Sequence, residues 1–354
     1  MKKITCLTLA VLLLGLSACN ATTPETTTTA AATTEATQPP EEAKVFKTLL
    51  IGQSLGEDTV WLLHKVLKTE MPDQEFVVAD IYQSVGLETH RDNILKNNAV
   101  YDYSKFDDNG LKQMKNVSIE LALKDEMWDL VIFNDTTYFT TQPAQFQDGD
   151  HAFMIDYILK TAAPGVKLGY NATWANPTSA LLWGSDRRDV PAVVHERFAN
   201  EFGGSRNEYY NRICENMKTY IETDEAYAFV FHTGTAMQYA SETHGVPEGA
   251  KDHNYELYRD YVHASDFARL LVAYQLYAQI YGLEKLEAVN VNKIEAKLRF
   301  TSEQKYGDLE ITQQHKDAII ASVNYALAHP NEVPPQTARE PAFLERPDLM
   351  PAQS

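Results

Sequence analysis

Short apolar runs alternate with longer segments of helical periodicity along most of this chain, and that alternation restricts the fold more than any other feature. The strand-like runs are 45–51, 75–82, 128–133, 166–171 and 227–232. The helix-length segments are 57–70, 111–124, 264–281 and 315–329. Strands separated by helices form βαβ units, which build a mainly parallel sheet with helices on both faces. We therefore expect an α/β protein, a three-layer α/β/α sandwich of flavodoxin-like type with about five mainly parallel strands.

The first residues have the pattern of a secretory signal. Lys2 and Lys3 precede an apolar run over 7–16, which is too short to be a typical membrane span. The tetrapeptide LSAC that ends at Cys19 resembles a bacterial lipobox, in which cleavage precedes the cysteine and its thiol is lipidated. An ordinary secretory signal with an incidental cysteine is the alternative. We expect 1–18 to be a lipoprotein signal peptide and Cys19 to carry the lipid anchor.

The remaining domain boundaries follow from composition. Residues 19–44 are rich in Thr, Ala, Pro and Glu and contain few large apolar side chains, so they cannot build a core. This segment is predicted to be a tether between the lipidated cysteine and a folded domain over 45–330. The Pro-rich segment 331–354 is predicted to be an irregular tail. The expected location is the bacterial cell envelope, facing the periplasm or the cell surface, with the lipid anchor as the only contact with a membrane.

Charge and cysteine content exclude several classes of function. Asp and Glu outnumber Lys and Arg by 49 to 31, and the resulting net charge of −18 repels nucleic acid phosphates. We therefore expect no nucleic acid partner. Because Cys6 would be removed and Cys19 lipidated, Cys214 would stand alone and no intramolecular disulfide is expected. Cys214 lies in a helix-like stretch, where a buried structural thiol is a better interpretation than a nucleophile.

Ser54 is the first candidate for chemistry. In parallel α/β sheets the functional site lies beyond the carboxyl ends of the strands, and Ser54 directly follows the first apolar run and precedes a helical segment. The N–H groups and positive dipole end of a helix N-terminus would stabilise an oxyanion there. An ordinary helix-capping serine is the alternative, and the GxSxG elbow of other serine hydrolases is absent.

Asp260 and His263 form the second candidate. A serine nucleophile needs a base, and the base needs a carboxylate that orients it. These two residues lie three positions apart just before the last long apolar helix, a spacing that could place the imidazole at Ser54 and the carboxylate at its other nitrogen. A solvated acidic loop with an incidental histidine is the alternative.

The order of these blocks resembles a known superfamily. A serine after the first strand, a glycine after the second, an asparagine after the third and D-x-x-H before the last main helix are the layout of the SGNH (GDSL-like) serine hydrolases. More closely, the chain resembles a poorly characterised bacterial lipoprotein branch of that superfamily. The matching stretches are Gly52-Gln53-Ser54-Leu55, Gly86-Leu87-Glu88-Thr89-His90 and Arg259-Asp260-Tyr261-Val262-His263-Ala264-Ser265. The resemblance extends over residues 45–330 and depends on the order and spacing of all blocks together.

The resemblance implies a catalytic role for three residues. Ser54 would be the nucleophile, His263 the general base and Asp260 the residue that orients His263. The oxyanion would be held by the Ser54 N–H, a backbone N–H near Gly86 and the side chain of Asn134.

The chain departs from the pattern of that branch in three places. Gln53 stands where Asn or Asp is usual. The second block has Ser84-Val85-Gly86 where the branch often has two glycines earlier, so Ser84 is an alternative to Gly86 as oxyanion donor. Asp135, next to Asn134, adds a carboxylate that would repel an oxyanion if it pointed inward.

Three further residues are candidates for substrate binding. Glu88 and His90 share a segment and could line a pocket or simply pair with each other. Trp174 follows a strand and could stack on a sugar ring or belong to the core. The other histidines lack a compact ligand spacing, so no metal is expected. No GxGxxG or P-loop motif opens a helix, so no nucleotide cofactor is expected.

The sequence thus predicts a serine esterase that hydrolyses acyl esters through an acyl-serine intermediate. By analogy with the superfamily, the expected partner is an ester-bearing small molecule or a glycan that carries O-acetyl groups. One alternative is a non-catalytic glycan- or solute-binding lipoprotein, in which Ser54 and His263 would lie too far apart to form a hydrogen bond. The other is an O-acyltransferase in which a sugar hydroxyl replaces water.

Overall fold

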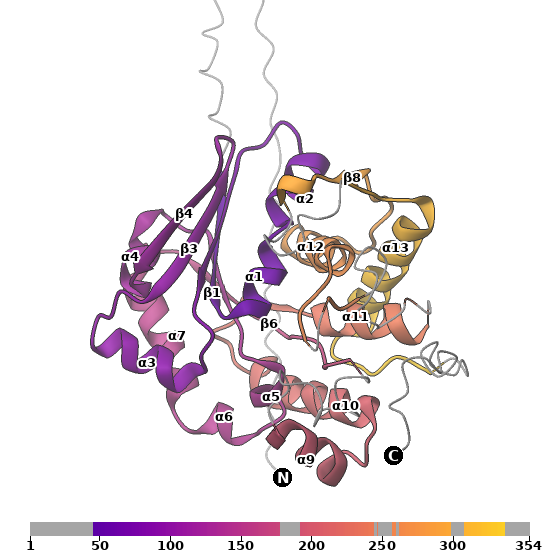
Figure 1. Cartoon of the computed structure of the whole chain (residues 1–354). Helices are drawn as coiled ribbons and strands as arrows, with labels where there is room; N and C mark the ends of the chain where they lie inside the picture. Colours follow the sequence, from indigo (N-terminus) through magenta and orange to yellow (C-terminus); the bar gives the residue numbers. More distant parts are fainter. Residues whose placement is uncertain are drawn as a thin grey trace, which may run out of the picture. The chain divides into compact units, whose positions relative to one another are not determined.

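A seven-stranded sheet forms the centre of the protein. The computed structural model describes residues 45–177, 192–243, 246, 257–259, 262–298 and 308–336. The strand order is β4-β3-β2-β1-β5-β6-β7 (Figure 1). The strands are β1 Phe46–Gly52, β2 Phe76–Tyr82, β3 Tyr101–Asp107, β4 Gly110–Val117, β5 Leu130–Phe133, β6 Lys167–Asn171 and β7 Phe229–Phe231. The five strands from β2 to β7 in this order are parallel, as the sequence predicts.

The antiparallel hairpin β3–β4 at one edge of the sheet differs from the prediction. Residues 111–124 were expected to be helical, but β4 occupies the first half of that segment and only α4, Ile119–Asp125, is a helix. Asp107 pairs with Gly110 across a two-residue turn, and the Asp107 carboxylate accepts the Asn109 N–H at 2.7 Å. Gly110 has a φ of +104°, which glycine adopts readily. Asn followed by Gly between two strand-like runs is the hairpin signal that overrides the helical period.

Helices cover both faces of the sheet. One face carries α1 Ser54–Val60, α2 Leu63–Glu70, α11 Thr233–Glu242, α12 Asp266–Ile280 and α13 Gln313–Ala328. The other carries α3 Leu87–Leu95, α4, α7 Asp150–Thr161, α9 Ala192–Glu201, α10 Arg206–Asn216 and the π-helical turn η1 Met217–Ile221. Two short helices, α5 Thr137–Thr140 and α6 Ala144–Gln147, follow β5. A small pair of strands, β8 Lys293–Ile294 and β9 Leu309–Glu310, and the turn η2 Ala296–Leu298 precede α13. The three-layer α/β/α prediction is confirmed.

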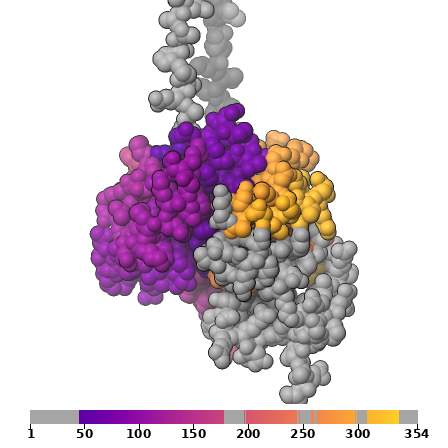
Figure 2. All heavy atoms as spheres, turned by 45° about the horizontal axis from the view of Figure 1, so that its top comes forward, coloured from indigo at the N-terminus to yellow at the C-terminus, as the bar shows by residue number. Residues whose placement is uncertain are grey.

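Alternation along the strands assigns each side chain to one of two buried cores. Leu130 and Ile132 of β5 belong to the core on the α12 side, whereas Val131 and Phe133 belong to the core on the α10 side. Because successive side chains of a strand point to opposite faces, the two polar residues after β5 are also directed to opposite sides. In the α12 layer, segments from the two ends of the chain pack together, since α12 contacts both α1 and α2. Figure 2 shows the N-terminal elements, in indigo and magenta, beside the orange and yellow C-terminal ones.

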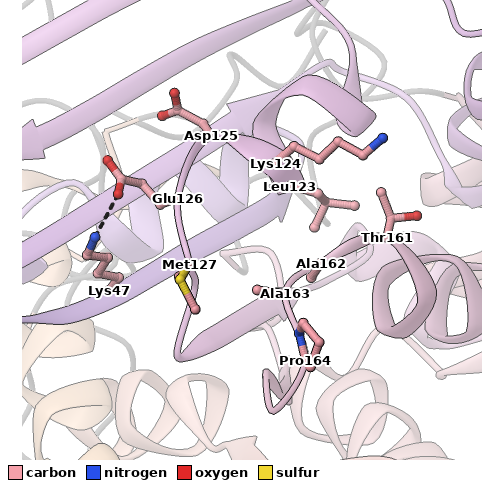
Figure 3. A pocket seen from close by; sticks show the side chains of 10 residues that line it. All are labelled: Lys47, Leu123, Lys124, Asp125, Glu126, Met127, Thr161, Ala162, Ala163 and Pro164. Carbon is pink, nitrogen blue, oxygen red and sulfur yellow. Dashed lines mark hydrogen bonds and ion pairs between the residues drawn. The ribbon is translucent and has the colours of Figure 1, made fainter.

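Two surface hollows in the described part of the chain lie away from the carboxyl ends of the parallel strands. A hollow of about 570 Å³ is lined by residues that precede or begin β1, β5 and β6, with Lys47 paired to Glu126 at 2.7 Å (Figure 3). A second, of about 520 Å³, lies between α2 and the β3–β4 hairpin. Among the described helices, none combines the length and apolar character needed to cross a membrane.

Candidate active site

Ser54 is the first residue of α1 and lies at the carboxyl end of the central strand β1. The preceding Gln53 caps the helix: its Oε1 accepts the Leu55 N–H at 2.8 Å, and its carbonyl accepts the Gly56 N–H at 2.8 Å and the Glu57 N–H at 3.2 Å. The first turn of a helix leaves its N–H groups without intrahelical partners. Gln53 therefore accepts the N–H groups of Leu55, Gly56 and Glu57. The Ser54 N–H has no acceptor within the described residues.

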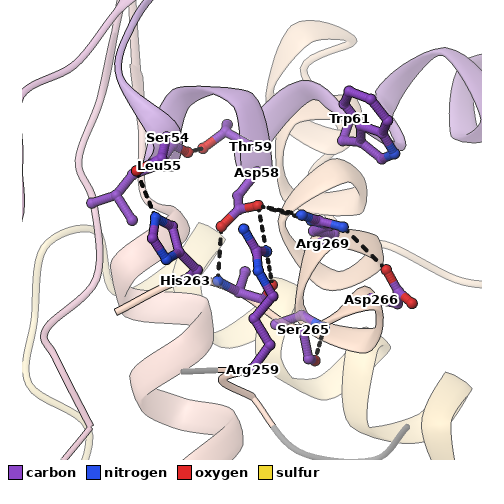
Figure 4. Close-up of polar contacts among 12 residues, drawn as sticks. Ser54, Leu55, Asp58, Thr59, Trp61, Arg259, His263, Ser265, Asp266 and Arg269 are labelled. Carbon is purple, nitrogen blue, oxygen red and sulfur yellow. Dashed lines mark hydrogen bonds and ion pairs between the residues drawn. The ribbon is translucent and has the colours of Figure 1, made fainter. Parts of the chain in front are cut away.

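His263 contacts Ser54 directly. Its Nε2 lies 2.6 Å from the Ser54 Oγ, although the two residues are 209 positions apart in the sequence (Figure 4). A loop between Leu257 and Ser265, here named the histidine loop, carries His263. The Ser265 N–H donates to the Leu257 carbonyl at 2.9 Å and closes this loop at its base. The Ser54–His263 distance is suited to proton transfer.

Asp260, the predicted third member of the triad, lies outside the described residues. It belongs to the histidine loop by its position in the sequence, and its role in orienting His263 stays a prediction. Cys19, the predicted lipidation site, also lies outside the described residues.

Asn134 reaches the turn that contains Ser54 from the end of β5. A Cβ atom on Gly52 would lie 2.4 Å from its Oδ1, and one on Gly56 would lie 2.9 Å from the same atom. The two glycines therefore provide the space in which the Asn134 amide packs against the turn. Its Nδ2 makes a long contact of 3.5 Å with the Asp135 carbonyl, which is weak enough to be exchanged for a stronger acceptor.

Asp135 does not point toward this turn. Its side chain is 1% exposed on the opposite face of the sheet, beside Tyr170. One carboxylate oxygen accepts the Thr136 N–H at 2.7 Å. Burial raises the pKa of Asp135 to about 7. The repulsion of an oxyanion that the sequence suggested therefore does not arise from this residue.

The loop between β2 and α3 supplies further backbone donors next to the turn. The Gln83 N–H donates to the Gly52 carbonyl at 3.1 Å and holds this loop beside β1, while the Val85 N–H donates to the Gln83 carbonyl. Within the described residues, the N–H groups of Ser84 and Gly86 have no acceptor. Both candidates from the sequence are thus left available, and a Cβ atom on Gly86 would lie 2.9 Å from the ring of Phe139.

The three predicted substrate-binding residues have different surroundings. Glu88 is exposed on α3. His90 is 2% exposed, and its Nδ1 lies 2.8 Å from the hydroxyl of Tyr101; burial lowers its pKa to about 4. Trp174 is fully buried, and its Nε1–H donates to the Val262 carbonyl at 2.8 Å. His90 and Trp174 are therefore core residues that offer no surface to a substrate, contrary to the prediction.

Charged residues on α1, the helix that begins at Ser54, were missed by the sequence analysis. Asp58 is fully buried and contacts Arg259 and Arg269 (Figure 4). Glu57 is one helical turn from Ser54, and burial, with the nearby charge of Asp58, raises its pKa to about 7. Burial and the charge of Glu57 raise the pKa of Asp80 well above its ordinary range. The only sequence signals were the four-residue spacing of Asp58 from Ser54 and the arginine before Asp260.

The segment that contains this site matches a described protein family. The family described as "Domain of unknown function (DUF4886)" matches residues 47–299, which is most of the chain. The chain belongs to the DUF4886 family. The matched segment includes every polar residue from Ser54 to His263 described above, so the site is part of the DUF4886 domain. Within the described residues, no three His, Cys, Asp or Glu side chains gather as a metal-binding group would require.

Solved structures support the fold of this DUF4886 domain. A crystal structure of a DUF4886 family protein from Bacteroides uniformis superposes with a TM-score of 0.62 at 21% identity, covering 82% of this chain and 98% of the other. At that identity the likeness shows the fold alone. A protein from Slackia heliotrinireducens, named provisionally as an SGNH hydrolase, has a TM-score of 0.38 at 17% identity, with coverages of 67% and 100%, too low to support an argument. No curated protein matches the chain.

Proposed function

We propose that this DUF4886 protein is a serine hydrolase of the SGNH type that cleaves acyl esters. The observation that carries the proposal is the 2.6 Å contact between His263 Nε2 and Ser54 Oγ, at the carboxyl end of the central parallel strand. A non-catalytic binding protein with this fold would have no need to hold a serine and a histidine at that distance. The contact therefore favours the hydrolase over the binding protein.

The geometry supports a two-step reaction. Ser54 Oγ attacks the ester carbonyl carbon as its proton passes to His263 Nε2, and the negative charge collects on the carbonyl oxygen. The C–O bond to the alcohol then breaks, and His263 returns the proton to the departing alkoxide. Water attacks the acyl-Ser54 in the same way, gives a proton to His263, and releases the acid as Ser54 regains its proton.

The oxyanion in both steps would be held by three groups. The Ser54 N–H is left open by the Gln53 cap, the β2–α3 loop offers the Ser84 or Gly86 N–H, and the Asn134 amide packs at the same turn. Preorganised donors of this kind usually make the largest single contribution to acyl transfer. Asp260 would hold the His263 ring through its other nitrogen.

The substrate class that we propose is an acyl ester, with O-acetyl groups on carbohydrate as the natural case. The tetrapeptide that ends at Cys19 suggests a lipid anchor in the cell envelope, where glycan esters occur. Incorporation of radiolabelled palmitate into the wild-type chain, and none into Cys19→Ala, is the expected result in a bacterial host. Absence of label in the wild-type chain would contradict the anchor without affecting the esterase.

The decisive experiment is hydrolysis of p-nitrophenyl acetate by the purified full chain. Ser54→Ala and His263→Ala should each lower kcat by about a thousandfold or more. A fluorophosphonate probe should label the wild-type chain and not Ser54→Ala. A folded wild-type protein that neither hydrolyses the ester nor reacts with the probe would contradict the proposal and favour the binding protein.

A further inference from the structure

Asp58 is a buried charged residue that the proposed reaction does not use. Its side chain is fully buried on α1, one helical turn after Ser54. Burying a carboxylate costs free energy unless opposite charges and hydrogen bonds compensate. The partners of Asp58 therefore determine whether its burial is compensated, and their positions relative to Ser54 and His263 determine what the contacts can hold in place.

One carboxylate oxygen of Asp58 binds the backbone of the histidine loop. Asp58 Oδ2 accepts the Ala264 N–H at 2.9 Å, while the Arg259 N–H donates to the His263 carbonyl at 3.0 Å. Both polar atoms of the peptide group between His263 and Ala264 are thus fixed. The plane of that peptide sets the direction in which the His263 side chain leaves the backbone.

The other carboxylate oxygen links the loop to a helix. Asp58 Oδ1 accepts from Arg259 Nη1 at 2.7 Å and from Arg269 Nε at 2.8 Å. Arg259 Nη1 also donates to the Ala264 carbonyl at 2.6 Å, and Arg269 is a fully buried residue of α12. One carboxylate therefore joins three elements: the nucleophile helix, the histidine loop and α12 (Figure 4).

Asp58 is charged in this setting. Burial alone would raise its pKa, but the two guanidinium groups outweigh burial and hold the pKa below its ordinary value. Hydrogen bonds to an ionised acceptor are stronger and shorter than those to a neutral one. The contact with the Ala264 N–H is therefore of the kind that can hold a loop in place.

We propose that Asp58 is a positioning residue that fixes the histidine loop on the nucleophile helix and so sets the distance between His263 and Ser54. The inference rests on the proposed function, since it assigns to Asp58 a role that acts through the position of His263 relative to Ser54. Asp58 lies four residues after Ser54 on one short helix, so the anchor of the loop and its target keep a fixed separation. Displacements of about 1 Å from reactive geometry can lower rates about 100-fold.

Two variants test the proposal at different cost to the fold. Asp58→Asn keeps the shape but replaces one acceptor oxygen by an NH2 donor, so the Ala264 and arginine contacts cannot all be kept. Arg259→Lys removes the guanidinium whose Nη1 links Asp58 to the Ala264 carbonyl, and it leaves the contact between Asp58 and Arg269 in the core. If Asp58→Asn does not fold, the kinetics of Arg259→Lys test the positioning role. Asp150→Asn is the matched control, because Asp150 is 4% exposed and pairs with Arg91 on the opposite face.

The expected kinetic result is a split between kcat and KM. With p-nitrophenyl acetate, and with rates normalised to the folded fraction, both site variants should lower kcat about 10- to 100-fold with KM nearly unchanged. The control should leave both constants at the wild-type values. Full kcat in both site variants would overturn the proposal, because a purely structural ion pair would affect only the folded fraction.

Crystal structures of the wild-type chain and the two site variants give a readout that does not depend on turnover. We expect His263 Nε2 within hydrogen-bond distance of Ser54 Oγ in the wild type, and a lost contact or a changed His263 rotamer in the variants. An unchanged contact in both variants would overturn the positioning role whatever the activity. A lost contact combined with an inactive wild-type protein would sustain the positioning role and contradict the esterase.

Discussion

Asp58 and Asp135 are both almost completely buried, on opposite faces of the same sheet, but their pKa values are shifted in opposite directions. Asp58 is 0% exposed, and two arginines hold its pKa below the ordinary value despite the burial. Asp135 is 1% exposed, and burial raises its pKa to about 7 because its one hydrogen bond, from the Thr136 N–H, does not compensate. The exposed fractions of the two side chains are nearly equal. The charged groups and hydrogen-bond donors beside each carboxyl group therefore determine whether it is ionised.

Two histidines on the face of Asp135 are also kept neutral by burial. On the face of Asp135, burial lowers the pKa of His90 and of His151 to about 4 each, and both rings pair with tyrosine hydroxyls. On the face of Asp58, a charged network reaches the loop that carries His263. Neutral groups complete a core, whereas paired charges fix a backbone segment at a defined place.

The largest expected effect comes from removing each carboxyl group entirely. Asp58→Ala leaves Arg259 and Arg269 buried without this carboxylate and should lower the free energy of unfolding by about 3–5 kcal/mol. Asp135→Ala removes a neutral, singly bonded group and should cost about 1–2 kcal/mol. Urea denaturation at pH 6 measures both. Equal losses of unfolding free energy in the two variants would contradict the difference between the two sites.

The pH dependence of stability should distinguish Asp135 next. Its pKa is about 7 in the folded protein and near 4 in the unfolded chain, so ionisation is opposed by folding and the wild-type protein loses stability as the pH rises from about 4 through 7. Asp135→Asn removes this loss, and the variant should gain roughly 2–4 kcal/mol on the wild type between pH 4 and pH 8. Denaturation midpoints at the two pH values measure the difference. A parallel pH dependence in wild type and variant would show that Asp135 is charged in the fold.

His90 should show the reverse pH dependence. The folded protein holds the pKa of this ring at about 4, below that of the unfolded chain, so stability is lost as the pH falls from about 6.5 toward 4. His90→Gln can still bind the Tyr101 hydroxyl and should reduce that loss by roughly 1–3 kcal/mol at pH 4. Thermal melts across this range measure it, and an unchanged acid-side slope would argue that the ring is already solvated.

The smallest expected effect comes from two tryptophans that make the same kind of bond on opposite faces. Trp174→Phe loses the hydrogen bond to the Val262 carbonyl, next to His263, and Trp128→Phe loses the bond to the Ala122 carbonyl at 2.9 Å. Each should cost about 0.5–1.5 kcal/mol in unfolding free energy. Only Trp174→Phe should also lower kcat for p-nitrophenyl acetate, by about 3- to 10-fold. A similar fall in kcat for Trp128→Phe would show that general loosening, not the histidine loop, is responsible.

The sequence predicts the parallel sheet and the location of the site because both depend on local patterns. Each buried strand is an apolar run, and polar residues that directly follow such runs, as Ser54 and Asn134 do, must gather at one edge. The histidine of a D-x-x-H block was placed at Ser54 by resemblance, and the contact is present. The β3–β4 hairpin was missed because an edge strand with mostly exposed side chains has no apolar run to reveal it.

The role of Asp58 could not be read from the sequence because its partners are remote. Arg259 and Arg269 are 201 and 211 positions away, and a local pattern does not show which distant carboxylate an arginine binds. Trp174 illustrates the same limit, since an aromatic residue after a strand is equally suited to a ligand or to the core. Only the packing of the histidine loop over that strand end decides between them.

The 209-residue separation of Ser54 and His263 has a consequence for biosynthesis. Ser54 leaves the ribosome early, whereas the histidine loop and α12, which carries the Arg269 that binds Asp58, are made much later. A nascent or prematurely terminated chain that ends before this loop carries Ser54 without His263. The Ser54–His263 contact can therefore form only after the C-terminal part of the domain has been translated and has docked, so this contact is completed late in folding.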